Sequence, residues 1–250
     1  MTHTKLTTTQ AKKILATSFL IILFCFTSCD QAPIFSAINK EIELEEAVIT
    51  GNVFSMIEIS GTLYTANGRI YSKNTSDIRG WTEHSKPSGR VTKVAKKDDN
   101  LYALVEETGN TTVYRHDKTS SPWTSTEEEF PATPLTKCTA EGNDYSASEK
   151  TIKKGTNVVY TANSTIHAIA YSDNTFYIAT EIGLEQATLE TDGTLSKVSI
   201  SSQAESLLGS YPIHGVWIFG HGIYASSITK NSRNNGLWGY YTDRTSWNRE

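Results

Sequence analysis

The chain has 250 residues, of which 38% are hydrophobic and 20% are charged, and its net charge is −4. This composition is typical of a globular protein and excludes a disordered tail. The excess of acidic residues excludes a bulk electrostatic attraction to nucleic acid, so no nucleic-acid partner is expected.

Residues 1–28 have the layout of a secretory signal peptide. Lys5, Lys12 and Lys13 precede an apolar run of 13 residues, Ile14–Phe26. A transmembrane helix needs about 20 apolar residues, so this run is too short to cross a bilayer. We therefore expect residues 1–28 to be removed during export.

The end of this segment, Phe26-Thr27-Ser28-Cys29, resembles the bacterial lipobox. The resemblance implies cleavage before Cys29, a diacylglycerol on its sulfur, and an acyl chain such as palmitate on its new amino group. Each buried methylene contributes about 0.8 kcal/mol, so several chains anchor a protein stably. We expect a lipid-anchored protein of the cell envelope, facing either the periplasm or the surface. The alternative is an ordinary signal peptide followed by a chance cysteine.

The expected mature chain divides into a tether, residues 29–46, and a folded domain, residues 47–250. Removal of residues 1–28 leaves 20 basic and 27 acidic residues. Cys138 then has no partner for a disulfide within the domain. It is expected to be a small buried hydrophobe rather than a reactive thiol.

A short unit with a central tyrosine recurs along residues 47–250. Most copies follow a turn-forming residue, and a short apolar strand precedes four of them, as at Ile166–Tyr171. A second strand follows, as at Leu184–Leu189. The tyrosines of the five copies are Tyr64, Tyr102, Tyr145, Tyr177 and Tyr224.

These repeats predict an all-β fold, a small β-propeller of about five blades with three to four antiparallel strands each. The third copy, near Leu135–Tyr160, is degraded, so four blades and an irregular insert are an alternative, and a β-sandwich is another. Ala47–Thr50 is expected to pair with the last blade and hide its edge. One weak helical candidate lies at Gln203–Leu208.

Three copies close on a tryptophan near a turn: Trp81, Trp123 and Trp247. These side chains are expected to brace the blades, and their functional alternative is an aromatic platform for a sugar or peptide. The repeat and the lipobox together resemble propeller-like bacterial lipoproteins, including some from spirochaetes. That resemblance depends on the Leu-Tyr-Ala and Trp-Thr units.

No catalytic or metal-binding constellation is predicted, and no cofactor is expected. Glu58 is the one clear acid on an expected innermost strand, while Glu141 and Asp173 fall at strand ends. His214 and His221 are too far apart in sequence for a close metal-ligand pair. The expected function is a non-enzymatic binding or scaffold module for a protein or glycan. The alternatives are a glycan-acting enzyme that uses Glu58 and a lectin with a tyrosine-lined pocket in each repeat.

Overall fold

The computed structural model describes residues 48–49, 51–77, 80–117, 122–228, 235–241 and 246–250. Residues Ala47–Glu250 form one compact unit. The predicted signal peptide, the tether and the lipidation site Cys29 lie outside the described residues.

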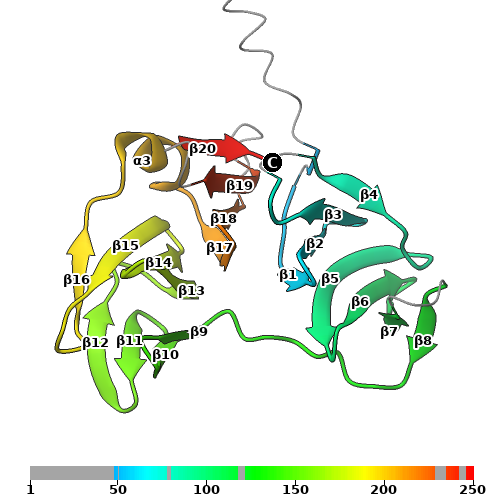
Figure 1. Cartoon of the computed structure of the whole chain (residues 1–250), viewed down its shortest axis with the longest axis horizontal. Helices are drawn as coiled ribbons and strands as arrows, with labels where there is room; N and C mark the ends of the chain where they lie inside the picture. The colour runs from blue at the N-terminus through cyan, green and yellow to red at the C-terminus, as the bar shows by residue number, and fades with distance from the viewer. Residues whose placement is uncertain (1–47, 50, 78–79, 118–121, 229–234, 242–245) are drawn as a thin grey trace, which may run out of the picture. The chain divides into compact units, whose positions relative to one another are not determined.

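The compact unit is built from five four-stranded antiparallel sheets, each made of four consecutive strands in the order of the sequence. Figure 1 shows these sheets arranged around a centre as the blades of a propeller. We label them blades A to E in chain order. The prediction of an all-β propeller with five blades is confirmed, and the irregular-insert and sandwich alternatives are wrong.

The first two blades lie between Met56 and Thr126. Blade A consists of β1 (Met56–Ile59), β2 (Thr62–Ala66), β3 (Ile70–Asn74) and β4 (Thr82–His84). Blade B consists of β5 (Arg90–Lys97), β6 (Asn100–Glu107), β7 (Asn110–His116) and β8 (Thr124–Thr126).

The other three blades lie between Lys137 and Arg249. Blade C consists of β9 (Lys137–Ala140), β10 (Asn143–Ser148), β11 (Thr151–Lys154) and β12 (Asn157–Thr161). Blade D consists of β13 (Ile166–Ser172), β14 (Thr175–Thr180), β15 (Gly183–Leu189) and β16 (Leu195–Val198). The helix α3 (Ser202–Leu208) leads to blade E, with β17 (Ile213–Phe219), β18 (Gly222–Ser227), β19 (Gly236–Tyr241) and β20 (Ser246–Arg249).

Two-residue turns join the first and second strands of each blade. In blades A to D both turn residues have positive φ, as at Ser60-Gly61 and Asp173-Asn174. This geometry matches the right-handed twist of the flanking strands and fixes their register. The repeated tyrosine therefore occupies the same place in β2, β6, β10, β14 and β18.

Four hydrophobic clusters lie between neighbouring blades. They join A to B, C to D, D to E, and E to A. Among the described residues no such cluster joins B to C; residues 127–136 connect these two blades instead. Leu135, on that connection, packs against both the D–E and the E–A clusters, and its carbonyl accepts a hydrogen bond from Ile169 N–H at 2.8 Å.

The ring closes where the first described residues meet blade E. Ile49 N–H donates to the Glu250 carbonyl at 3.2 Å, and Val53 N–H donates to Ser226 Oγ at 3.1 Å. Of the segment Ala47–Thr50 that was predicted to close the ring, Val48 and Ile49 are described, and Ile49 makes this contact.

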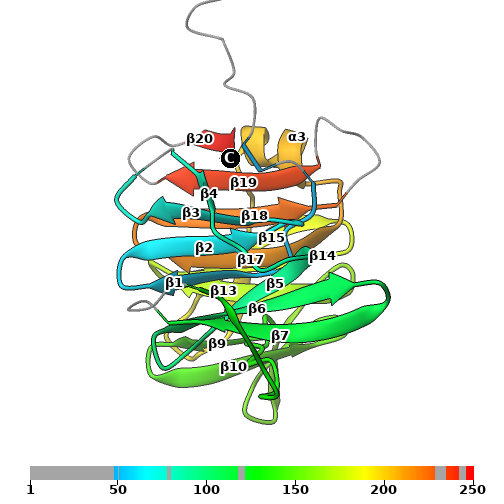
Figure 2. The same cartoon turned by 90° about the vertical axis from the view of Figure 1, so that its right-hand side faces the viewer.

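The strands run between the two faces of the ring, which Figure 2 shows from the side. We call the face at which β1, β5, β13 and β17 begin the starting face. The β14–β15 turn lies on it, because Ile166 at the start of β13 pairs with Thr180 at the end of β14. The connection from β16 through α3 to β17 lies on the same face, because β16 ends there and β17 begins there.

Candidate functional site

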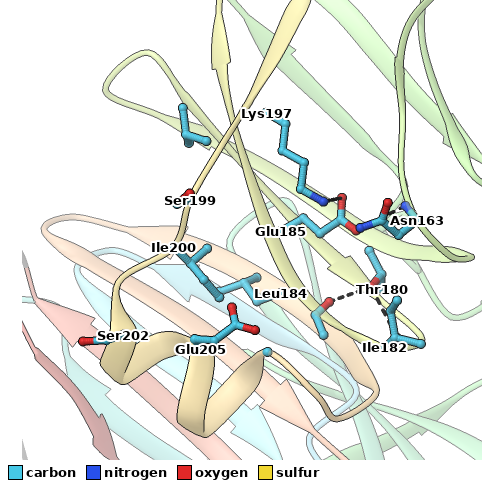
Figure 3. Close-up of a pocket in the computed structure, with 13 residues that line it drawn as sticks. Asn163, Thr180, Ile182, Leu184, Glu185, Lys197, Ser199, Ile200, Ser202 and Glu205 are labelled. Carbon is cyan, nitrogen blue, oxygen red and sulfur yellow. Dashed lines mark hydrogen bonds and ion pairs between the residues drawn. The ribbon is translucent and has the colours of Figure 1, made fainter.

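The candidate site is a pocket of about 430 Å³ beside blade D on the starting face. Its lining comes from the beginning of β15, the end of β16, the connection between blades C and D, and α3 (Figure 3). This volume lies in the range of small-ligand pockets, about 300–1,000 Å³.

The departure of the chain from its repeat creates this pocket. The connection between blades D and E contains α3, whose N-cap Ser201 accepts a hydrogen bond from Ala204 N–H at 3.2 Å. Ala204 and Leu208 bury the inner side of the helix in the D–E cluster. Glu205, on the same helix, lines the pocket and points into it (Figure 3).

Gly183 allows α3 to approach the sheet closely. Its φ is +150°, and a Cβ there would lie 2.7 Å from the backbone of Gly209. A side chain at residue 183 would therefore push the end of the helix away from β15, so the shape of the pocket depends on this glycine.

Glu185 is a buried carboxylate on the pocket wall, with a side chain 8% exposed. It accepts hydrogen bonds from the Tyr160 hydroxyl at 2.7 Å and from Asn163 N–H at 3.2 Å. The Lys197 ammonium lies 3.4 Å from it, on a side chain that is 51% exposed. Burial, with the neighbouring carboxylate, raises the pKa of Tyr160, so its hydroxyl keeps its proton and remains a donor.

Apolar side chains form the remaining surface of the pocket. Leu184 is buried, Ile200 packs against the D–E cluster, and Ile182 in the β14–β15 turn is 49% exposed. The pocket therefore combines an oriented carboxylate with an apolar wall that is open at the β14–β15 turn.

A stacked histidine pair lies on the same face, at the junction of blades D and E. The rings of His167 and His214 are 4.8 Å apart at an interplanar angle of 26°. His167 Nε2 lies 2.7 Å from Glu181 Oε2, in the turn that also carries Ile182. Burial lowers the pKa of His214, and the nearby His167 lowers it further.

Both histidines occupy bulges at equivalent positions. The register shifts between Ile166 and Ala168 in β13, and between Ile213 and Gly215 in β17. A bulge re-aims the side chain of the extra residue. No group of three His, Cys, Asp or Glu in the described part of the chain is arranged to hold a metal ion.

The three tryptophans named from the sequence lie between blades. Trp81 is 5% exposed in the E–A cluster and Trp247 is 4% exposed in the D–E cluster. Trp123 packs against the A–B cluster, and its Nε1 donates to the Ser85 carbonyl at 3.0 Å. These positions suit bracing, and ligand contact at the tryptophans stays a prediction.

The repeated tyrosines also face the inter-blade spaces. Tyr102, Tyr145 and Tyr224 are at most 2% exposed, while Tyr64 and Tyr177 are half-buried against clusters. Buried tyrosines cannot line an open pocket in every repeat, which weakens the lectin alternative in that form.

The three carboxylates named from the sequence belong to different blades. Glu58 is half-buried in β1, opposite Leu63 of β2. Glu141, in the β9–β10 turn, accepts a hydrogen bond from the Tyr171 hydroxyl at 2.9 Å, and Asp173 lies in the β13–β14 turn. The pocket carboxylates Glu185 and Glu205 were not named from the sequence; the helical candidate Gln203–Leu208 was the available signal.

Cys138 packs half-buried against the C–D cluster. Burial raises the pKa of its thiol to about 12. At neutral pH the thiol is therefore protonated and a poor nucleophile, as expected from the sequence.

A model of the TP013X lipoprotein family matches residues 7–232. The chain belongs to the TP013X lipoprotein family. This membership gives it a lipid-anchored location in the cell envelope. No helix in the described ranges has the length and apolarity needed to cross a membrane.

Relatives of this lipoprotein include uncharacterized lipoproteins of Treponema pallidum (strain Nichols). One is 30% identical over 109 residues, which cover 41% of this chain and 21% of the relative. Another is 31% identical over 85 residues, which cover 33% of this chain and 22% of the relative. These alignments thus span about a fifth of the length of the relatives.

Similar solved structures include the extracellular domain of the hybrid two-component system BT4673 from B. thetaiotaomicron. Its TM-score is 0.33 at 13% identity, and the match covers 80% of this chain and 28% of that one. A chain of a nidogen/laminin complex gives a TM-score of 0.34 at 12% identity, covering 80% and 78%. At these scores the fold assignment of the lipoprotein depends on its own strand order.

Proposed function

We propose that this lipoprotein is a binding module of the cell envelope that holds a protein or glycan on its starting face at blades D and E. The observation that carries the proposal is the gathering of three features there. These are the pocket beside Glu185, the stacked pair His167 and His214, and the exposed side chain of Ile182. A pocket with a few oriented polar groups and an apolar wall is the usual form of a binding site.

The proposed role is binding without chemical conversion. The Glu185 carboxylate is already oriented by Tyr160 and Asn163, so it offers a rigid hydrogen-bonding group to a partner. Rigid, oriented groups reduce the entropy lost on binding. The predicted anchor at Cys29 would hold this site near the membrane, as an envelope scaffold or as an adhesin at the surface.

Site-specific photocrosslinking in cells tests the proposal. A photoreactive residue replaces Ile182 in the full chain, and a matched control places it at Val158 on β12, an apolar side chain that is 54% exposed. The expected result is a discrete adduct from residue 182 that residue 158 does not give. Equal adducts from both positions, or none from residue 182, would refute the assignment of the face.

Protease shaving of intact cells divides the candidate partners. A propeller on the cell surface is degraded in intact cells, whereas a propeller in the periplasm is degraded after the outer membrane is permeabilised. The first result directs the search to extracellular partners and the second to envelope components.

A glycan-acting enzyme is the second candidate, because Glu185 and Glu205 line one pocket. Glycosidases require a pair of carboxylates. Turnover of chromogenic glycosides by the lipoprotein, lost in Glu205→Gln, would replace the binding proposal. Turnover that is lost in a Glu58 variant instead would place the catalytic site at Glu58, as in the glycan-acting alternative of the sequence analysis.

A further inference from the structure

We infer that the pocket beside α3 receives an arginine side chain of a partner polypeptide, whose guanidinium displaces Lys197 from Glu185. This inference rests on the proposed binding function and specifies the chemical group of the partner that the pocket recognises. It depends on the charges, the fixed geometry and the apolar wall of the pocket.

The charges of the pocket favour a cation. Two carboxylates line it, Glu185 and Glu205, against a single base, Lys197. Among the interactions of the described residues, the carboxylate of Glu205 has no salt-bridge partner, although it points into the cavity (Figure 3). A positively charged group therefore gains more from this pocket than a neutral or anionic group does.

Among the described residues, three groups of the protein contact the Glu185 carboxylate: the Tyr160 hydroxyl, the Asn163 N–H and the Lys197 ammonium. Tyr160 is a buried side chain, and Asn163 donates through its backbone N–H, so both partners stay in place. Lys197 is the replaceable partner, because its side chain is 51% exposed and its ammonium lies 3.4 Å away. This separation is longer than the roughly 2.7–2.9 Å of a strong charge-assisted hydrogen bond, so the contact with Lys197 is the weakest of the three.

A guanidinium suits this position better than the resident ammonium. It presents planar, paired N–H donors that can bind a carboxylate in a bidentate manner, at about 2.7–2.9 Å. Ile182, Leu184 and Ile200 supply an apolar wall for the methylene groups that carry the guanidinium. Long basic side chains bury their stems in this way.

Calorimetric titration of the full lipidated chain in nonionic detergent tests the inference. The probe is acetyl-Gly-Arg-Gly-amide, and the control is the same peptide with citrulline, which keeps the shape and removes the charge. The expected result is weak saturable binding of the arginine peptide and at least about tenfold weaker binding of the citrulline peptide.

Three variants locate the effect. Glu185→Gln should weaken binding about tenfold or more, and Lys197→Met should strengthen it several-fold, because the competing cation is gone. Glu190→Gln, an exposed carboxylate outside the pocket, is the control for bulk charge and should change nothing. Because Glu185 is buried, loss of binding in Glu185→Gln would also follow from misfolding. Lys197 is half exposed, so Lys197→Met is expected to fold and tests the inference independently.

Three results would overturn the inference. Equal binding of the arginine and citrulline peptides would show that charge is not recognised. Weaker or unchanged binding in Lys197→Met would show that the ligand does not take the place of Lys197. Absence of binding in every variant, together with a specific adduct at Ile182, would reject arginine as the ligand and leave the binding face in place.

Discussion

The E–A and B–C junctions of the ring are closed by opposite means. At E–A, nine buried residues form a cluster, and a buried ion pair joins Lys73 of β3 to Glu250 at 2.8 Å. At B–C, residues 127–136 connect the two blades, and Glu128 contacts Lys97 of blade B at 2.7 Å and the Tyr102 hydroxyl at 3.2 Å. The first junction is closed by a buried cluster, whereas the second is spanned by a connection that half-exposed charges attach to blade B.

The buried pair at E–A is enclosed by aromatic rings. The Lys73 ammonium lies 4.8–5.1 Å from the ring centroids of Trp81, Tyr224 and Tyr241. Trp81 Nε1 donates to Glu250 at 2.6 Å, and the Tyr241 hydroxyl donates to it at 2.8 Å. Removal of one member therefore leaves a desolvated group without its partner, whereas the charges at B–C can turn to water.

Among the variants that test this comparison, Lys73→Met is expected to have the largest effect on the free energy of unfolding. It leaves the Glu250 carboxylate buried without its cation, which should lower the free energy of unfolding by about 3–5 kcal/mol. Urea denaturation measures the loss. The double variant Lys73→Met/Glu250→Gln should be more stable than the single variant, and an equally unstable double variant would contradict the charge explanation.

Leu135→Ala tests whether the B–C connection also stabilises the rest of the ring. Leu135 is half-buried but contacts both the D–E and E–A clusters, so a loss of about 2 kcal/mol is expected. Leu207→Ala is the matched control, since Leu207 is half-buried and packs against the D–E cluster alone. An equal loss in both variants would mean that Leu135 has no added role at E–A.

Glu128→Gln should have a small effect on global stability. The side chains of Glu128, Lys97 and Arg115 are 37–48% exposed, and such pairs contribute at most about 1 kcal/mol. The change should instead increase the rate at which protease cleaves residues 127–136, measured by mass spectrometry of the fragments. A loss as large as that of Lys73→Met would overturn the distinction between the two junctions.

Mild acid is expected to weaken the D–E junction by a modest amount. The pKa of His214 is lowered by burial from its ordinary value of 6.5, so the unfolded chain binds more protons than the folded one as pH falls below about 6.5. Stability should therefore fall with pH in this window. His214→Gln should reduce the slope, with the part due to His116 remaining, because burial lowers the pKa of His116 too. Glu128→Gln should leave the profile unchanged, as measured by thermal unfolding between pH 7 and pH 5.

Much of the fold could be predicted from the sequence because blades are local structures. The strands around Tyr64, Tyr102, Tyr177 and Tyr224 could be placed from alternating apolar residues and turn residues. The blade around Tyr145 was harder to recognise, because β10 carries Asp144 and Ser146 on either side of the tyrosine, where most other blades have apolar residues. The same polar composition explains why blade C forms no apolar cluster with blade B.

The candidate site could not be predicted because its parts come from distant places in the chain. Tyr160 of blade C and Glu185 of blade D are 25 residues apart, and nothing in either segment marks the contact. In the sequence, Lys73 resembles any lysine on a strand. Its partner Glu250 is 177 residues away, and the structure is needed to identify the pair. Contacts between blades depend on how the repeats close into a ring, which local patterns do not encode.

The position of Glu250 also has a consequence for the order in which the domain folds. Each blade is a meander of consecutive strands and can form early, because its contacts are close in sequence. The cluster that unites blades E and A needs segments from both ends of the domain, so we expect it to assemble last. If the predicted signal peptide directs export of the unfolded chain, this order keeps the ring open until its final strand is available.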